Sequence, residues 1–247
     1  MKQDGFDVAF EVGLGVVNKI KNTQKEAIKK AGRTISEAHR NGKTFYVSGS
    51  GHSHGVAEEL YGRAGGLAFS VPILTSELTL TEHPTKSTFI ERLAGYATIL
   101  VDLYKIGEGD VVLIASNSGR NAYPVELAIE AKKRGAKVIA MTSMAHSTQV
   151  SSRDKSGKRL FEVADIVIDT CGEVGDSATY IDGIDVPILP TSSIANAFIC
   201  ASITAEVVCD LTAHNCEVEV LVSANVDGGY EKNEKYMEKY CRMYIKK

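Results

Sequence analysis

The sequence predicts an α/β protein built on a doubly wound parallel sheet of about five strands, with helices covering both faces. Short apolar runs without polar alternation, such as residues 111–114, are typical of strands buried on both sides. These runs alternate along the chain with segments whose apolar residues recur at helical spacing. The chain has 247 residues, 44% of them hydrophobic and 24% charged, which is enough for one such domain with added helices.

Each element follows from this pattern and from the residues that stop it. Before the sheet, helical spacing predicts one or two amphipathic helices over 8–39, which Asn41 and Gly42 end. The predicted strands are 44–48, 70–74, 111–114, 137–141 and 165–168. Helices are predicted over 56–62 and 87–103, and Pro124 with Glu126 opens another. A loop with a short helix over 147–159 and a Gly- and Asp-rich connection over 172–185 follow. A long helix is predicted from about Ser193, and a charged helix over 231–244 has Tyr236, Tyr240 and Tyr244 on one stripe.

The order of elements predicts a single domain over 1–247, because no repeat or low-complexity linker divides the chain. Its parts are N-terminal helices over 1–42, a sheet core over 43–215 and a C-terminal extension over 216–247.

Composition argues against several partners and compartments. The net charge of −3 provides no basic field, so we expect no nucleic-acid partner. The apolar stretch 194–208 is shorter than the roughly 20 residues that span a bilayer, so we expect a buried helix and no membrane association. Residues 1–7 are polar and do not resemble a signal sequence. The five cysteines include no C-x-x-C pair, which favours reduced thiols in the cytoplasm.

Small polar residues follow the strand at 111–114 and suit an anion. Ser116, Asn117, Ser118 and Gly119 form a turn before a predicted helix. Free backbone N–H groups and the positive end of the helix dipole converge at such a turn, which favours phosphate. The alternative is that the serines only cap the helix, as in many turns between a strand and a helix.

A second turn of the same kind follows the first strand, in the sequence VSGSGHSHGVAEEL. Both turns follow parallel strands of one sheet and therefore should open at the same edge. Ser50 and Ser53 of this turn, with Ser116 and Ser118 of the other, would then surround one anion.

Several ordered motifs over about 6–226 resemble the sugar isomerase (SIS) domain family. Residues 109–142 resemble the phosphate-binding strand, loop and helix of N-acetylmuramic acid 6-phosphate etherases, and AEELYGR at 57–63 is similar to a helix of phosphoheptose isomerases. LPTSSIANAFICASITAEVV is similar to the C-terminal helix of arabinose 5-phosphate isomerases. The overall pattern, with GHSH, AEEL and SANVDGG, is most similar to a poorly characterised bacterial group of phosphosugar-binding or phosphoheptose isomerase-like proteins.

The resemblance implies a flavodoxin-like, three-layer αβα sandwich with a five-stranded parallel sheet. It also implies a homodimer or homotetramer and a sugar-phosphate ligand. The residues that it assigns to phosphate are Ser50, Ser53, Ser116, Ser118 and Asn121, to which the turn itself adds Asn117. Arg120 follows this turn and is positioned either for a forked contact with the anion or for a salt bridge.

Isomerisation of an aldose to a ketose needs a base for the carbon-bound proton and an acid for the carbonyl oxygen. The resemblance favours Glu59 as the base; Glu58 and Glu59 diverge by about 100° on a helix, so only one should face the pocket. The alternative is that both are solvated acids of the first helical turn.

Histidines and a second carboxylate complete the candidate catalytic set. His52 and His54 lie in the first turn, where they serve as acid or ring opener or are surface residues, and His52 stands where arabinose 5-phosphate isomerases have a Lys. Glu77 and His83 resemble a Glu and His of the same isomerases; otherwise they belong to a polar loop.

We therefore expect a cofactor-free aldose/ketose sugar-phosphate isomerase, with an amino-sugar-phosphate etherase or lyase, or a non-catalytic phosphosugar sensor, as alternatives. Phosphoheptose isomerases often bind zinc through a His one helical turn before the catalytic Glu. Gly55 stands at that position here, so no metal is expected.

Overall fold

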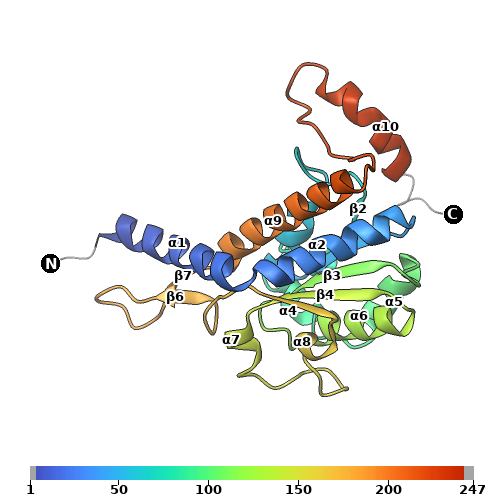
Figure 1. The fold of residues 1–247 in the computed structure, drawn as a ribbon. Coiled ribbons are helices and arrows are strands. Elements are labelled where there is room, and N and C mark those ends of the chain that lie inside the picture. The colour runs from blue at the N-terminus through green and yellow to red at the C-terminus, as the bar shows by residue number, and fades with distance from the viewer. Residues whose placement is uncertain (1–3, 242–247) are drawn as a thin grey trace.

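A five-stranded parallel sheet forms the centre of the structure, a computed structural model that describes residues 4–241 (Figure 1). The strands are β1 (Phe45–Gly49), β2 (Ser70–Ile73), β3 (Val111–Ala115), β4 (Lys137–Thr142) and β5 (Ile166–Asp169). Their order across the sheet is β2-β1-β3-β4-β5, and every neighbouring pair is parallel. The predicted doubly wound α/β fold is confirmed.

Helices cover both faces of the sheet because successive strand residues point to opposite sides. Phe45 and Val47 of β1 enter one hydrophobic core, whereas Tyr46 enters the other. The helices on the first face are α1 (Gly5–Thr23), α2 (Lys25–Arg40), α3 (Gly55–Leu60) and α9 (Ser192–Ala213). Those on the second are α5 (Tyr96–Leu103), α6 (Ala122–Lys133) and α8 (Leu160–Val163). The result is a three-layer sandwich.

The strand order creates a switch point between β1 and β3. From β1 the chain first moves outward to β2 and then returns to place β3 on the other side of β1. Gly49 at the end of β1 is in register with Ala115 at the end of β3, so the turns that follow leave the sheet at the same level. Ligands of doubly wound sheets bind at such a point, outside the carboxyl ends of the strands.

The helix predicted over 87–103 is in fact two helices, and that prediction was wrong. α4 (Lys86–Ile90) ends before a turn, and α5 begins at Tyr96. Gly95 between them has a left-handed φ of 89°, and its N–H donates to Glu126 Oε2 over 2.6 Å. A glycine adopts this conformation readily, whereas a continuous helix excludes it.

Three smaller expectations also changed. The connection over 172–185 contains β6 (Ser177–Thr179), which pairs antiparallel with β7 (Ile188–Pro190). The helix after β3 begins at Ala122, two residues before Pro124. The segment between β4 and β5 holds α7 (Met144–Ser147) and α8 at its two ends, not one short helix within it.

Helix α9 is longer than the apolar stretch from which it was predicted. It has 22 residues, so by length and composition it is able to cross a membrane, and the argument from shortness was wrong. In the structure α9 packs against α2 and α3, and 39% of its most apolar 18-residue stretch is buried. The core helix of a soluble protein meets the same criterion.

The C-terminal part is attached through a short backbone pairing. The N–H of Ala68 donates to Glu219 O over 2.9 Å, and the N–H of Leu221 donates to Gly66 O over 3.0 Å. The chain then forms α10 (Gly229–Cys241), which extends away from the sheet (Figure 1). Tyr244 of the predicted tyrosine stripe lies outside the described residues.

Candidate functional site

The turn after β3 has a conformation that requires a glycine at one position. Ser116 Oγ accepts a hydrogen bond from the N–H of Gly119 over 3.2 Å. Gly119 has a φ of 58°, and a Cβ placed there would lie 3.0 Å from Ser147 Oγ and 3.1 Å from Thr142 Oγ1. The turn is therefore held by its own hydroxyl group and packs closely against the end of β4.

The serines of this turn do not cap α6. The N-cap residue is Asn121, and its side chain makes no capping hydrogen bond. Instead its amide donates to Glu91 Oε1 over 2.7 Å, and its Oδ1 accepts from the guanidinium of Arg153 over 3.0 Å. The alternative of simple helix capping is thus not what the geometry shows.

The turn after β1 reaches the same carboxylate. It continues into the short 3-10 helix η1 (Gly51–His54), and Ser50 Oγ donates to Glu91 Oε2 over 2.5 Å. Ser50 and Asn121, predicted from different turns to contact one anion, therefore meet on the side chain of Glu91. Burial raises the pKa of this carboxyl group, against the opposing effects of the Ser50 hydrogen bond and nearby arginines.

Glu91 and Arg153 carried no signal in the sequence. Glu91 lies inside the stretch that helical spacing assigned to one helix, where a charged residue is ordinary. It reaches the turns only because helix α4 ends at Ile90 and the next helix, α5, begins at Tyr96. Arg153 lies in the loop between α7 and α8, and its side chain is exposed.

The other predicted phosphate residues differ in their surroundings. Ser53 and Ser118 are half-buried, and the N–H of Ser53 donates to Ser50 O over 3.0 Å. Asn117 Oδ1 lies 3.4 Å from the Thr170 hydroxyl at the end of β5. The guanidinium of Arg120 donates to Ser151 O over 2.8 Å and to Ser151 Oγ over 3.2 Å, and its contact with an anion stays a prediction.

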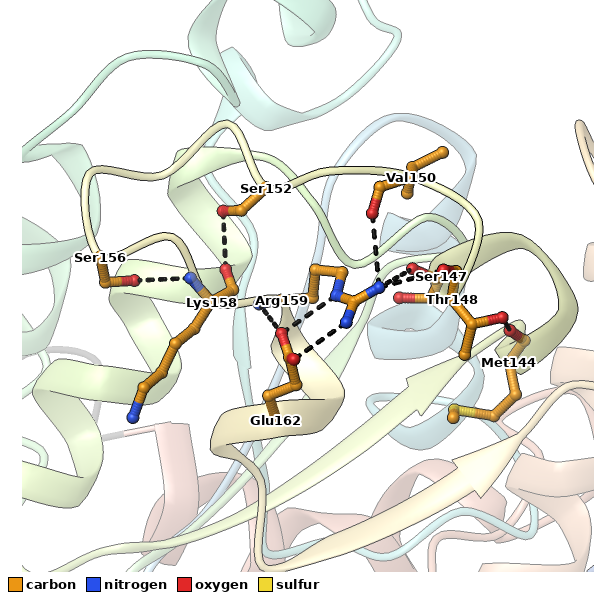
Figure 2. A network of polar contacts seen from close by, with 9 residues as sticks. All are labelled: Met144, Ser147, Thr148, Val150, Ser152, Ser156, Lys158, Arg159 and Glu162. Atoms are coloured by element: carbon orange, nitrogen blue, oxygen red, sulfur yellow. Dashed lines mark hydrogen bonds and ion pairs between the residues drawn. The ribbon is translucent and has the colours of Figure 1, made fainter.

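Arg159 organises the loop that carries Arg153 (Figure 2). Its guanidinium forms a fork on Glu162, with contacts of 3.0 Å to Oε2 and 2.9 Å to Oε1, and this pair lowers the pKa of Glu162 to about 2. The same group donates to the carbonyls of Ser147 (3.1 Å), Thr148 (3.2 Å) and Val150 (3.4 Å). The N–H of Arg153 completes the attachment by donating to Arg120 O over 2.7 Å.

A cavity of about 430 Å³ opens next to η1, between α3 and the start of α9. Its lining includes His52 and Glu59, both predicted as catalytic, and polar residues of α9. The full set is His52, Gly55, Glu58, Glu59, Arg63, Ser193, Asn196 and Ala197. Both Glu58 and Glu59 line it, whereas only one of them was expected to face the pocket.

Each of these carboxylates has a cationic or ionisable partner one helical turn away. Glu59 forms an ion pair with Arg63. Glu58 Oε1 lies 3.4 Å from His54 Nε2, and His54 Nδ1 is hydrogen-bonded to Gly51 O. Glu59 and Arg63 also line a larger adjoining cavity of about 730 Å³ that runs along the apolar side chains of α9.

Glu77 and His83 lie apart from these cavities. Glu77 belongs to the short 3-10 helix η2 (Ser76–Leu78), is exposed, and accepts from the Tyr96 hydroxyl over 3.4 Å. Hydrogen bonds, first from its own backbone, lower its pKa. The exposed His83 contacts Thr85 Oγ1 through Nδ1 at 3.1 Å. Neither residue lines the cavities of about 430 and 730 Å³.

No set of metal ligands stands out in the part of the chain that the structure describes. Over residues 4–241, no three His, Cys, Asp or Glu side chains gather closely enough to hold a metal ion.

Comparisons with known proteins agree with this architecture. UPF0309 protein BH3325 of Halalkalibacterium halodurans is 45% identical over 227 residues, which cover 92% of this chain and 94% of that protein. Phosphoheptose isomerase GmhA of Neisseria gonorrhoeae has the same fold, with a TM-score of 0.51 at 15% identity over 84% of this chain and 97% of that one. The Vibrio vulnificus NanR protein complexed with ManNAc-6P matches with a TM-score of 0.54 at 13% identity, over 96% of this chain and 70% of that one.

The family model described as SIS domain matches residues 10–143, which include β1, β3 and both turns at the switch point. With this match over more than half of its residues, the chain belongs to the SIS domain family.

Proposed function

We propose that the protein binds a sugar phosphate at the switch point, with the phosphate group on the turns after β1 and β3. Support comes from the convergence of Ser50 and Asn121 on one carboxylate, since a group that accepts hydrogen bonds and carries negative charge already occupies this position. A phosphate oxygen has the same needs. Ser116, Ser118, Ser53 and Asn117 line the same two turns, and ManNAc-6P bound to the NanR structural neighbour is a ligand of this class.

The reaction that the site favours is aldose/ketose isomerisation. The observation that carries it is that His52 and Glu59 line one cavity directly beside the turn with Ser50 and Ser53. Glu59 acts as the base that moves the proton between two sugar carbons, and His52 acts as the acid at the carbonyl oxygen. His54, bound to Glu58 and Gly51, positions the turn. Glu77 and His83 are not assigned to proton transfer.

Turnover of a panel of aldose and ketose phosphates with five to seven carbons tests this assignment, with amino-sugar phosphates included. We expect interconversion by the wild type and a loss of about 10²–10⁴-fold in kcat for Glu59→Gln. His52→Asn should fall in the same range. Glu77→Gln is the matched control among the candidate bases and should retain activity.

Three results would overturn the isomerase assignment. One is the absence of turnover for every sugar phosphate that binds. Another is full activity of Glu59→Gln. The third is release of lactate from N-acetylmuramic acid 6-phosphate, which would identify an etherase.

The ion pair between Glu59 and Arg63 favours a second candidate function. A cation beside a carboxylate lowers its proton affinity and weakens it as a base. If this pair persists with ligand bound, the protein is a phosphosugar sensor without catalysis. Calorimetry would then show saturable binding of a sugar phosphate that is recovered unchanged.

We also propose that the protein is a single-domain cytoplasmic homo-oligomer. Phe6, Phe10 and Leu14, at 68%, 56% and 59% exposure, form an apolar stripe on α1 for a second copy to cover. The free thiols of Cys171, Cys200, Cys209 and Cys216 are typical of a reducing compartment. Light scattering should give a mass of at least two chains, and Phe10→Ser should reduce it; a monomeric wild type would contradict the proposal.

A further inference from the structure

Glu91 occupies the position proposed for the substrate's phosphate group. Its two carboxylate oxygens accept from Ser50 Oγ and from the Asn121 amide, at 2.5 and 2.7 Å. Its backbone carbonyl accepts from the N–H of Tyr123 over 2.9 Å, which attaches it to the first turn of α6. Two of the donors that would bind phosphate, Ser50 and Asn121, are therefore already engaged by an acidic group of the chain itself.

More than one positively charged side chain lies near the Glu91 carboxylate. Arg92 follows Glu91 in the chain, Arg153 enters from the loop held by Arg159, and Arg120 lies beside Arg153. Desolvation and the charges of Arg120 and Arg92 lower the pKa of Arg153, so these guanidinium groups repel one another. One carboxylate neutralises only part of this charge, whereas a phosphate dianion neutralises more of it.

The segment that carries Glu91 has little secondary structure to lose if it moves. Glu91 lies directly after α4, which has five residues, and before the left-handed Gly95. Phe89 and Leu93 on either side are 69% and 53% exposed. A shift of the side chain away from Asn121 therefore breaks a few hydrogen bonds without unfolding a long helix.

We propose that Glu91 is an internal competitor for the phosphate site, and that Arg153 is a phosphate ligand. In the unliganded protein, Glu91 holds Ser50 and Asn121 in place. The incoming phosphate displaces the carboxylate, because two anions repel each other at one set of donors, and takes contacts from Ser50, Asn121 and Arg153. Glu91 thus sets which ligands bind: a neutral sugar does not displace it, whereas a phosphorylated sugar does. This inference rests on the proposed phosphate site.

The apparent affinity for phosphate is the intrinsic affinity multiplied by the fraction of molecules in which Glu91 has left Ser50 and Asn121. Titration of inorganic phosphate into the full chain by calorimetry tests this. We expect Glu91→Gln to bind phosphate about tenfold more tightly than the wild type, because the charge that repels the ligand is removed. Glu11→Gln, at an exposed position on α1, is the matched control and should leave affinity unchanged.

Arg153→Gln provides a test that does not depend on how Glu91→Gln folds, since the Arg153 side chain is exposed. It should weaken phosphate binding by about three- to tenfold, and Arg33→Gln on α2 serves as its control. The inference is overturned if the wild type binds phosphate and substitution of Ser116 weakens this binding, but Glu91→Gln binds phosphate no more tightly than the wild type. It is also overturned if, in the same case, Arg153→Gln binds phosphate no more weakly than the wild type. If neither the wild type nor Glu91→Gln binds phosphate or any sugar phosphate, the proposed function fails together with the inference.

Discussion

The side-chain amide of Asn121 donates a hydrogen bond to the carboxylate of Glu91 over 2.7 Å. This contact joins the first residue before α6 to the turn after α4, 30 residues earlier in the chain. The Asn121 side chain makes no capping hydrogen bond to α6 and instead shares the Glu91 carboxylate with Ser50 of the turn after β1. Two turns with similar sequences thereby become parts of one polar cradle at the switch point of the sheet.

Gly119→Ala should be costly because the turn after β3 requires both a left-handed backbone and an absent Cβ. The backbone conformation costs about 1–2 kcal/mol, and contact with Ser147 Oγ and Thr142 Oγ1 adds ~1–3 kcal/mol. Gly157→Ala is the matched control, because Gly157 has a φ of 72° but open space around it. In urea unfolding, Gly119→Ala should lose more unfolding free energy than Gly157→Ala. Equal losses of unfolding free energy in the two variants would contradict the packing argument.

Arg159→Lys should loosen the loop over 148–158 without altering the charge. Lysine cannot reproduce the fork on Glu162 together with three carbonyl contacts. Hydrogen exchange should become faster at the amides of this loop, and phosphate affinity should fall because Arg153 is less well positioned. Arg33→Lys on α2 is the control, and unchanged exchange in the loop of Arg159→Lys would refute the role of this arginine.

Stability should fall at mildly acidic pH because of His39. Its ring stacks on Phe69 with centroids 3.7 Å apart, and burial lowers its pKa from 6.5 although Glu219, 3.3 Å away, opposes the shift. A depressed pKa favours the neutral histidine in the folded state. This contribution is therefore fully present above about pH 6.5 and is lost as the pH falls through the lower folded-state pKa.

Unfolding free energies measured in urea from pH 8 to pH 5 test this pH dependence. His39→Gln should flatten the decline below pH 6.5. His83→Gln, at an exposed position, should not change it. A slope that is the same in His39→Gln and in the wild type would assign the decline to other groups.

Gly32→Ala should destabilise the crossing of α2 and α9. A Cβ at Gly32 would lie 2.6 Å from Glu206 Cβ, so the two helices must separate, at a cost of about 1–3 kcal/mol. Gly15→Ala on α1 is the matched control, because no atom lies within 4 Å of the added methyl group. That change should stabilise the protein by about 0.5–1 kcal/mol, and thermal melting separates the two outcomes by sign.

Much of the fold could be predicted because its determinants are local. The run 111–114 has no polar residue, which indicates burial on both faces, and β3 has this environment in the structure. The break between α4 and α5 could not be predicted in the same way. Apolar residues recur at helical spacing on both sides of Gly95, and a single glycine within such a pattern is common.

The candidate site, like the fold, could be predicted only where its determinants are local. Ser50 and Ser116 could be placed at one edge because each follows a parallel strand, and the register of Gly49 with Ala115 confirms this placement. The partners of these turns could not be predicted. Arg153 lies 32 residues after Asn121, and the loop between them has no periodic pattern that would fix its path.

By itself, the sequence determined the five strands of the parallel sheet and the two polar turns at its carboxyl edge, because burial periodicity and turn chemistry act between residues close in the chain. Only the tertiary structure decided that Glu91 joins Ser50 to Asn121, and that α9 completes the cavity around His52 and Glu59. These contacts depend on how separately formed elements pack, and packing is set by the shapes of surfaces that are distant in the sequence.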